Sequence, residues 1–307
     1  MSVLLDAGLV VLTMGGLWLG ARLLVGGASA LAVRLGVSQV VIGLTVVALG
    51  TSMPEFAVTT EAALVGRGDI AVGNVVGSNV FNLGFVLGLT ALFGTLDRTR
   101  RLVRRDGLML VLAAIALLAA LWDGRLTRME GGLFVVGLVG YLLVLVARSP
   151  ATTAAEPADP TSPVGEVVRL IGGLVLIVGS ARLLITSASA IAAAAGISEW
   201  AIGVTVVAAG TSTPELVTAV VAARRGQSGL SIGSLIGSDL FNILGVLGLA
   251  ALVEPVSVAP EAIVSLVWLL GTVLLVVTLL WTDRKLTRPE GALLLVIAGI
   301  RWLVNLL

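Results

Sequence analysis

The sequence contains no cysteine and no histidine among its 307 residues. These two absences exclude disulfides, thiol nucleophiles, imidazole bases and the usual zinc sites. Charged residues make up only 12% of the chain. The net charge of +1 says nothing about nucleic acid, and we expect no nucleic-acid partner. Hydrophobic residues instead account for 58%, with a mean hydropathy of +1.11. This composition lies far from that of soluble domains and predicts a polytopic membrane protein.

Ten apolar segments have the length expected of membrane spans, although the fourth is short. The N-terminal segment lacks a basic region and a convincing cleavage site, so we interpret it as the first span and not as a removable signal peptide. We therefore predict an all-α membrane protein with ten transmembrane helices. The segments lie at residues 3–32, 38–65, 70–94, 107–122, 129–147, 165–195, 199–223, 230–253, 260–281 and 288–307.

The two halves of the sequence repeat at a constant offset of 160 residues, so that Gly43–Glu55 returns as Gly203–Glu215. Each half carries five predicted spans. Because five is odd, the second half must enter the membrane from the opposite side, which gives an inverted repeat. We expect a first five-helix repeat at residues 1–147, a flexible cytoplasmic linker at 148–164, and a second, inverted repeat at 165–307.

The distribution of basic residues predicts the orientation. With both termini outside, twelve basic residues fall on the cytoplasmic side and four on the outer side, as the positive-inside rule favours. The outer four are Arg67, Arg125, Arg128 and Arg301. The cytoplasmic twelve are Arg34, Arg98, Arg100, Arg101, Arg104, Arg105, Arg148, Arg224, Arg225, Arg284, Lys285 and Arg288. We expect a multi-pass protein of the plasma membrane, functional as a monomer.

Both copies of the repeated motif place a proline inside an apolar helical run. Proline removes one helix hydrogen bond, so Pro54 frees the carbonyl of Gly50 and Pro214 that of Gly210. Inside a bilayer, such a break is tolerated only within protein or beside a polar cavity. A glutamate follows each proline directly, and this predicts an ion site at the two breaks.

The residues around each break offer only oxygen ligands. Threonine, serine and glutamate of each motif share one helix face, and the third and eighth spans add a serine and an asparagine four residues apart. Oxygen ligands suit hard cations such as Ca²⁺ or Na⁺, and two ionised glutamates balance one Ca²⁺. A carboxylate at mid-membrane costs about 2.5–3.5 kcal/mol or more, which favours a functional role. The candidates are Glu55, Glu215, Thr51, Ser52, Ser78, Asn82, Thr211, Ser212, Ser238 and Asn242.

Two structural explanations compete with this interpretation. Serine and threonine often only pack membrane helices or donate to their own backbone carbonyls. The glutamates could also serve as ion-pair partners of Arg22 and Arg182, the basic residues that lie well inside predicted spans. The position of both glutamates beside duplicated breaks and hydroxyls favours the ion site.

At these residues the chain resembles the calcium/cation antiporter superfamily, which comprises sodium/calcium exchangers and their proton-coupled relatives. The resemblance covers essentially the whole chain. It implies ten spans, with long tilted first and sixth helices, and ligands from spans two, three, seven and eight. Its signature regions are Gly43–Thr59, Gly73–Leu89, Gly203–Ala219 and Gly233–Leu249.

Carried over to this sequence, the resemblance implies that Glu55 and Glu215 are the calcium carboxylates, shared with sodium. Asn82 and Asn242 would occupy the middle positions, and the carbonyls of Ala48 and Ala208 would assist. The flanking sodium sites would be lined by Thr51, Ser52, Ser78, Thr211, Ser212 and Ser238. No cofactor is implied; Ca²⁺ and Na⁺, or H⁺, are the transported partners.

The sequence departs from the resemblance at two positions. Some exchangers of this kind carry aspartate where Asn242 stands, and the two-carboxylate pattern also occurs in proton/calcium exchangers. The Gly-Thr-Ser-x-Pro-Glu form favours sodium, but a proton-coupled exchanger stays an alternative. Asp239 replaces the asparagine found at the equivalent position 79, and we assign it no role from the sequence.

An intramembrane protease and a passive cation channel are the two alternative functions. Gly66-Arg67-Gly68-Asp69 matches a string of intramembrane aspartyl proteases, but the second aspartate that such enzymes need after a tyrosine is missing, because Tyr141 precedes Leu142. A passive cation channel is the better rival. We predict that the protein is not an enzyme. We expect a secondary antiporter that exchanges Ca²⁺ for Na⁺ by alternating access.

Overall fold

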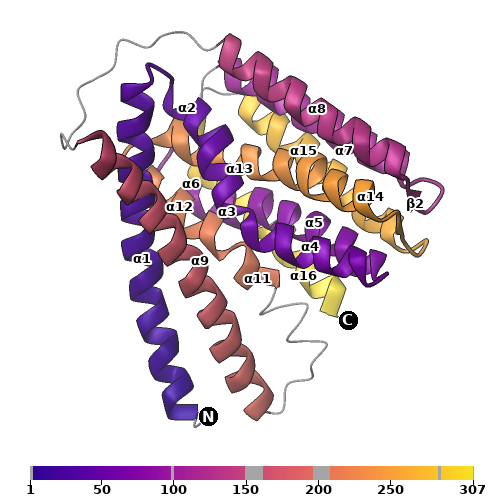
Figure 1. Ribbon diagram of the computed structural model, residues 1–307, viewed down its shortest axis with the longest axis horizontal. Helices are drawn as coiled ribbons and strands as arrows, with labels where there is room; N and C mark the ends of the chain where they lie inside the picture. The colour runs from indigo at the N-terminus through magenta and orange to yellow at the C-terminus, as the bar shows by residue number, and fades with distance from the viewer. Residues whose placement is uncertain (1–2, 98–99, 149–161, 196–207, 283–284, 307) are drawn as a thin grey trace.

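The computed structural model describes residues 3–97, 100–148, 162–195, 208–282 and 285–306, and these are almost entirely helical (Figure 1). The 148–164 linker and the start of the second motif copy, Gly203–Val207, lie largely or wholly outside the described residues. In the first half, the helices are α1 (Val3–Arg34), α2 (Gln39–Ile42), η1 (Gly43–Val47), α3 (Ala48–Thr51), α4 (Met53–Leu64), α5 (Gly68–Phe81), η2 (Asn82–Val86), α6 (Leu87–Phe93), η3 (Leu102–Gly107), α7 (Leu108–Ala120) and α8 (Arg128–Ala147).

The second half repeats this order. Its helices are α9 (Pro163–Ala194), α11 (Ala208–Thr211), α12 (Thr213–Arg224), α13 (Ser228–Leu240), η5 (Phe241–Leu247), α14 (Gly248–Val253), α15 (Ala262–Thr282) and α16 (Arg288–Leu306). The elements named η are π-helical turns, and they interrupt the equivalent helices α5–α6 and α13–α14 in both halves. Such wide turns often occur at functional sites.

The helices are apolar and long enough for a multi-pass membrane protein. Six of them meet the length and hydropathy of a membrane span among the described residues, and the bent pair formed by α2–α3 and α4 makes a seventh. Each of the ten predicted segments is mainly helical where the structure describes it, with turns at the breaks and at some ends. The helical class is thus confirmed, whereas the full set of ten spans stays a prediction.

Two short antiparallel strand pairs link the halves. The strand β1 (Leu96–Asp97) pairs with β4 (Lys285–Leu286), and β2 (Arg125–Leu126) pairs with β3 (Val256–Ser257). Lys285 also forms an ion pair with Asp97 at 3.4 Å. The loop after α6 therefore meets the loop after α15, while their repeat equivalents meet each other. An inverted repeat requires this exchange, because paired loops must lie on one side of the membrane.

The longest helices, α1 and α9, lie side by side along one edge of the molecule and at an angle to the other helices (Figure 1). They run antiparallel, since Arg34 at the end of α1 binds Glu166 at the start of α9 through two contacts of 2.7 and 2.9 Å. Glycines bring the two backbones together: a Cβ on Gly173 would lie 2.7 Å from the carbonyl oxygen of Gly20. Small residues permit such close helix packing in membranes.

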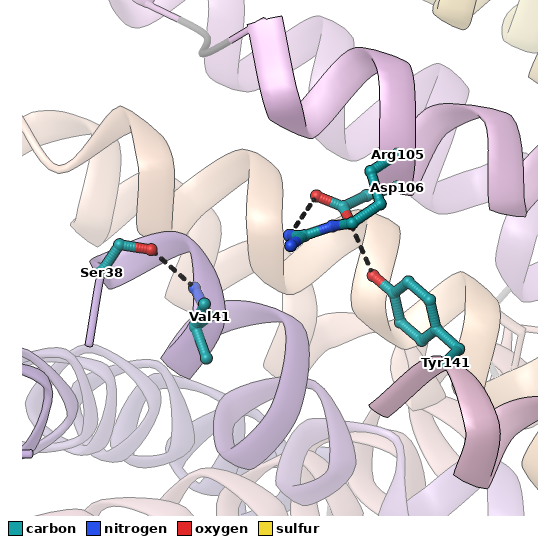
Figure 2. A network of polar contacts seen from close by, with 5 residues as sticks. All are labelled: Ser38, Val41, Arg105, Asp106 and Tyr141. Atoms are coloured by element: carbon teal, nitrogen blue, oxygen red, sulfur yellow. Dashed lines mark hydrogen bonds and ion pairs between the residues drawn. The ribbon is translucent and has the colours of Figure 1, made fainter. Parts of the chain in front are cut away.

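A buried polar network joins the start of α7 to α8 (Figure 2). Asp106 accepts hydrogen bonds from Arg105 at 2.6 Å and from the hydroxyl of Tyr141 at 2.9 Å. These contacts satisfy a carboxylate that is fully buried. The arginine belongs to the basic run predicted as a cytoplasmic loop, and Figure 2 shows that it turns back to the helix bundle. Tyr141 therefore has a structural role.

We predict that Gly173→Ala destabilises the protein, because the added methyl group would collide with the backbone of α1. Overpacking of this kind costs about 1–3 kcal/mol. The adjacent Gly172 provides the matched control, since a Cβ at this position meets nothing within 4 Å. Thermal unfolding of the purified protein should show a lower midpoint for Gly173→Ala and an unchanged midpoint for Gly172→Ala. Equal midpoints for the two variants would contradict the close packing of α1 and α9.

Candidate cation site

The predicted helix breaks lie at the two repeated motifs. Between α3 and α4 the chain bends by 50° at Ser52, and Pro54 stands in the first turn of α4. The second half has the same arrangement, with Ser212 between α11 and α12. Proline is accepted in a first turn because that turn has no backbone partner for its nitrogen. The break therefore places each following glutamate at a helix N-terminus, where the helix dipole favours a negative charge.

The two glutamates lie within the protein interior. Glu55 is 0% exposed and Glu215 is 1% exposed. They are close enough to interact electrostatically. Among the described residues, neither glutamate forms an ion pair with an arginine or lysine. Two carboxyl groups are thus buried without a basic partner, and their charged form is costly in the absence of a cation.

Hydroxyls from opposite halves contact each glutamate. Ser212 of the second half donates to Glu55 Oε1 at 3.2 Å, and Ser52 of the first half donates to Glu215 Oε1 at 3.3 Å. Each glutamate also receives a serine from its own half: Ser238 lies 3.2 Å from Glu215, and Ser78 lies beside Glu55. The structure thus brings both predicted motifs together into one site with approximate two-fold symmetry.

The threonines and the predicted carbonyl groups lie at the edge of this cluster. Thr51 Oγ1 donates back to the carbonyl of Val47 at 3.1 Å and lies 3.3 Å from Ser238 Oγ. The Ala48 carbonyl is 3.5 Å from the same serine hydroxyl. Thr211 is buried, and Ala208 is the first residue of α11. Thr51 therefore donates to the backbone of its own helix, as the structural explanation expects. Its contact with Ser238 joins the two halves.

The two amides at the predicted middle positions are fully buried. Asn82 Nδ2 donates to Asp239 Oδ1 at 3.0 Å, and Asn242 Nδ2 donates to Asn79 Oδ1 at 2.9 Å. The nitrogen of each amide thus has a hydrogen-bond partner. The carbonyl oxygen of each amide has none and can accept a further contact.

Several buried oxygens in this region have no hydrogen-bond partner. An unpartnered buried polar atom normally costs about 1–3 kcal/mol, so a cluster of them requires an explanation. All are acceptors or hydroxyls, which is the chemistry that hard cations prefer. Among the described residues no group of three or more Asp, Glu, His or Cys could hold a metal, so neutral oxygens must complete any coordination. The atoms are Glu55 Oε2, Glu215 Oε2, Asn82 Oδ1, Asn242 Oδ1, Asp239 Oδ2 and Thr218 Oγ1.

Asp239 is the residue whose role the sequence left open. It is fully buried and bonds to Asn82, and its backbone carbonyl accepts from Asn79 Nδ2 at 3.2 Å. The signal was present in the sequence, because the two halves differ at this position although the preceding Gly-Ser and the following Phe-Asn recur. Its consequence was hidden, since only the packing of α13 against the first half shows that Asp239 orients the Asn82 amide.

The competing interpretations do not fit the geometry. Arg22 and Arg182 are exposed, and the guanidinium of Arg22 lies over the ring of Trp18 at 4.7 Å. Neither serves as a partner for the glutamates. Asp69, the aspartate of the protease-like string, is a loop contact whose carboxylate accepts from the amide of Ala259 at 2.8 Å.

Comparisons with known proteins identify the family of the chain. Residues 5–147 and 166–306 match the family model for sodium/calcium exchanger proteins. The chain belongs to this family. Within the family it is 37% identical to the putative antiporter CaxA of Alkalimonas amylolytica, over 96% of this chain and 95% of the relative. It is 29% identical to the sodium/calcium exchanger MaX1 of Methanosarcina acetivorans, over 90% and 91% of the two chains.

Solved structures show the same fold. The chain superposes on the sodium-calcium exchanger NCX_Mj with a TM-score of 0.87 and 31% identity, covering 97% of this chain and 98% of the other. The structure of that exchanger soaked with Na⁺ and Sr²⁺ matches this chain equally well, with a TM-score of 0.87. The relatives are transporters, in agreement with the prediction that the chain is not an enzyme.

The contact between Asp239 and Asn82 leads to a prediction about stability. Asp239→Asn keeps an acceptor oxygen for Asn82 and removes a buried charge, so we expect an unchanged or higher unfolding temperature without added cations. Asp239→Leu leaves the Asn82 nitrogen without a partner and should lose about 1–3 kcal/mol. Thermal unfolding in cation-free buffer measures both. A large loss in Asp239→Asn would show that the negative charge itself holds the fold together.

Proposed function

We propose that the protein is a secondary antiporter that exchanges Ca²⁺ for Na⁺ across the membrane by alternating access. One observation carries the proposal: two buried glutamates without a basic partner face each other across the repeat, each with one oxygen unbonded. A site that must release its ion cannot be filled permanently by protein groups. The family membership supports the same conclusion.

The proposed calcium ligands are Glu55 and Glu215, whose two negative charges balance one Ca²⁺. The free oxygens of Asn82 and Asn242 supply neutral ligands next to them. Flanking sodium positions would use oxygens that lie beside the glutamates. These are the hydroxyls of Thr51, Ser52, Ser78, Thr211, Ser212 and Ser238, and the carbonyls of Ala48 and Ala208.

Sodium is the favoured coupling ion because the hydroxyls contact the glutamates from both halves. A proton-coupled exchanger would need only the carboxylates, and the serine contacts would then contribute little. Three sodium ions against two carboxylates leave one positive charge, so sodium-coupled exchange would be electrogenic. Two protons for one calcium ion would be neutral.

The proposed transport cycle uses the duplicated architecture. We propose ten spans in two inverted repeats, residues 1–147 and 165–307, with both termini outside the plasma membrane and a monomer as the functional unit. The exchanged strand pairs β1–β4 and β2–β3 support the inversion. In this scheme α1 and α9 move as a pair across the other helices and open the site, which is closed to solvent in this structure, to either face.

The antiport reaction can be tested in sealed vesicles containing the purified protein. Calcium uptake should require an outward sodium gradient and stop when sodium is equal on both sides. Ionophore collapse of the gradient is the control for leak. Calcium flux that proceeds unchanged without any counter-ion gradient would identify a passive channel instead.

The carboxylate pair predicts the effect of charge removal. Glu55→Gln or Glu215→Gln should reduce calcium exchange at least about a hundredfold, because one charge cannot balance Ca²⁺ in a site without water. Folding should persist, since each change removes a buried charge. Glu61→Gln is the matched control, on the same helix as Glu55 but exposed. Normal exchange by either site variant would disprove the ligand assignment.

The serine contacts lead to a test of the coupling ion. Ser52→Ala and Ser212→Ala should weaken sodium-driven exchange about tenfold, because each removes a direct contact to a glutamate. Ser234→Ala is the control, since this buried hydroxyl on α13 donates to the carbonyl of Ser231 and not to a glutamate. Exchange measured under voltage clamp should carry current. Voltage-insensitive, pH-driven exchange that tolerates both alanines would instead establish proton coupling.

A further inference from the structure

A second feature of the molecule lies apart from the glutamates. A cleft of about 410 Å³ opens between α1, α6 and the end of α12. Its walls combine arginines with aromatic and aliphatic side chains, and none of the described residues that line it is a carboxylate. The lining includes Trp18, Arg22, Leu89, Phe93, Arg224 and Arg225.

The three arginines are held against the walls but are not neutralised. The guanidinium of Arg22 lies 4.7 Å from the ring centre of Trp18, and that of Arg224 lies 4.8 Å from the ring centre of Phe93. Arg225 donates to the backbone carbonyl of Arg22 at 3.2 Å. In the part of the chain that the structure describes, none of the three forms an ion pair. The cleft therefore carries positive charge that attracts an anionic partner.

The repeat provides an internal comparison, because each residue of the cleft has an equivalent 160 positions away. The equivalent of Arg22 is also an arginine, Arg182. The other four polar or aromatic members of the cleft have aliphatic equivalents. In the opposite half, Trp18, Phe93, Arg224 and Arg225 correspond to Val178, Val253, Leu64 and Val65. Only one side of this two-fold molecule therefore carries the arginine pair and its aromatic supports.

The location and chemistry of the cleft identify the ligand class. Arg224 and Arg225 end α12, on the side that the basic residues predict to be cytoplasmic, where the leaflet is rich in anionic lipids. Guanidinium groups bind phosphate through paired hydrogen bonds. Leu89 and Leu216 lie in the same cleft and provide an apolar surface that suits an acyl chain.

We propose that this cleft binds one anionic phospholipid, with its phosphate on Arg22, Arg224 and Arg225 and an acyl chain along the apolar wall. The lipid bridges α1 on one side and α6 and α12 on the other. Zwitterionic lipids bind more weakly, because their positively charged headgroup repels the arginines.

The test is a lipid competition followed by native mass spectrometry of the purified full-length protein. Phosphatidylglycerol and phosphatidylcholine are offered at equal concentration, and the adducts of each are counted. The unmodified protein should retain phosphatidylglycerol preferentially. The double variant Arg224→Gln/Arg225→Gln should lower that preference about thirtyfold, as expected for two arginines at a membrane surface. Arg224→Lys/Arg225→Lys should retain a partial preference.

Arg104→Gln is the matched control. This arginine also lies over an aromatic ring, at 5.6 Å from that of Trp281, and on the same predicted side, but outside the cleft. It should leave the lipid preference unchanged. An unaltered preference in the Arg224/Arg225 glutamine variant, or an equal loss in Arg104→Gln, overturns the proposal. Displacement of the lipid by millimolar inorganic phosphate would also overturn it, since the cleft would then be a site for free phosphate.

Discussion

Two glutamate side chains that no basic group neutralises among the described residues are the constraint on which the rest of this structure depends. Burying a carboxylate in a membrane protein is expensive, and Glu55 and Glu215 each keep one oxygen without a partner. The helix breaks, the serines and the neighbouring amides all act on this pair. The breaks place each carboxylate at a helix N-terminus, and the serines bind its first oxygen. In the proposed function, the second oxygen is the one that binds and releases the ion.

Neither half of the molecule forms this site alone. Ser212 of the second half donates to Glu55, and Ser52 of the first half donates to Glu215. Each of these two glutamates therefore depends on the other repeat. Close backbone packing makes the exchange possible: a Cβ on Gly43 would lie 2.8 Å from the carbonyl oxygen of Leu230. The glycine allows η1 to approach α13 closely. An ion bound between the halves would therefore experience any movement of one half against the other.

The places where the repeat is not symmetric are as informative as those where it is. Asp239 stands opposite Asn79 in the repeat and determines how the Asn82 amide is oriented. Arg224 and Arg225 stand where the first half has Leu64 and Val65. The first difference lies beside the proposed ion site and the second at the face predicted to be cytoplasmic. A duplicated transporter whose halves were identical would have two equivalent faces, and the two arginines make the faces of this one chemically different.

The sequence by itself determined the class and the duplication, and it predicted most residues of the candidate site. Its hydropathy requires membrane helices, and a proline followed by a glutamate in two copies requires two polar breaks, because these properties depend on local chemistry alone. The structure confirmed the broken helices and brought the twice-repeated serines and glutamates together. Tertiary packing alone decided which hydroxyl meets which carboxylate, which way the amides of Asn82 and Asn242 point, and how Asp239 takes part. Packing also makes Arg105, which the sequence predicts to lie in a loop, the partner of Asp106. It forms the arginine cleft from residues of α1, α6 and α12. These features join residues far apart in the chain, and no local pattern specifies the distance between them.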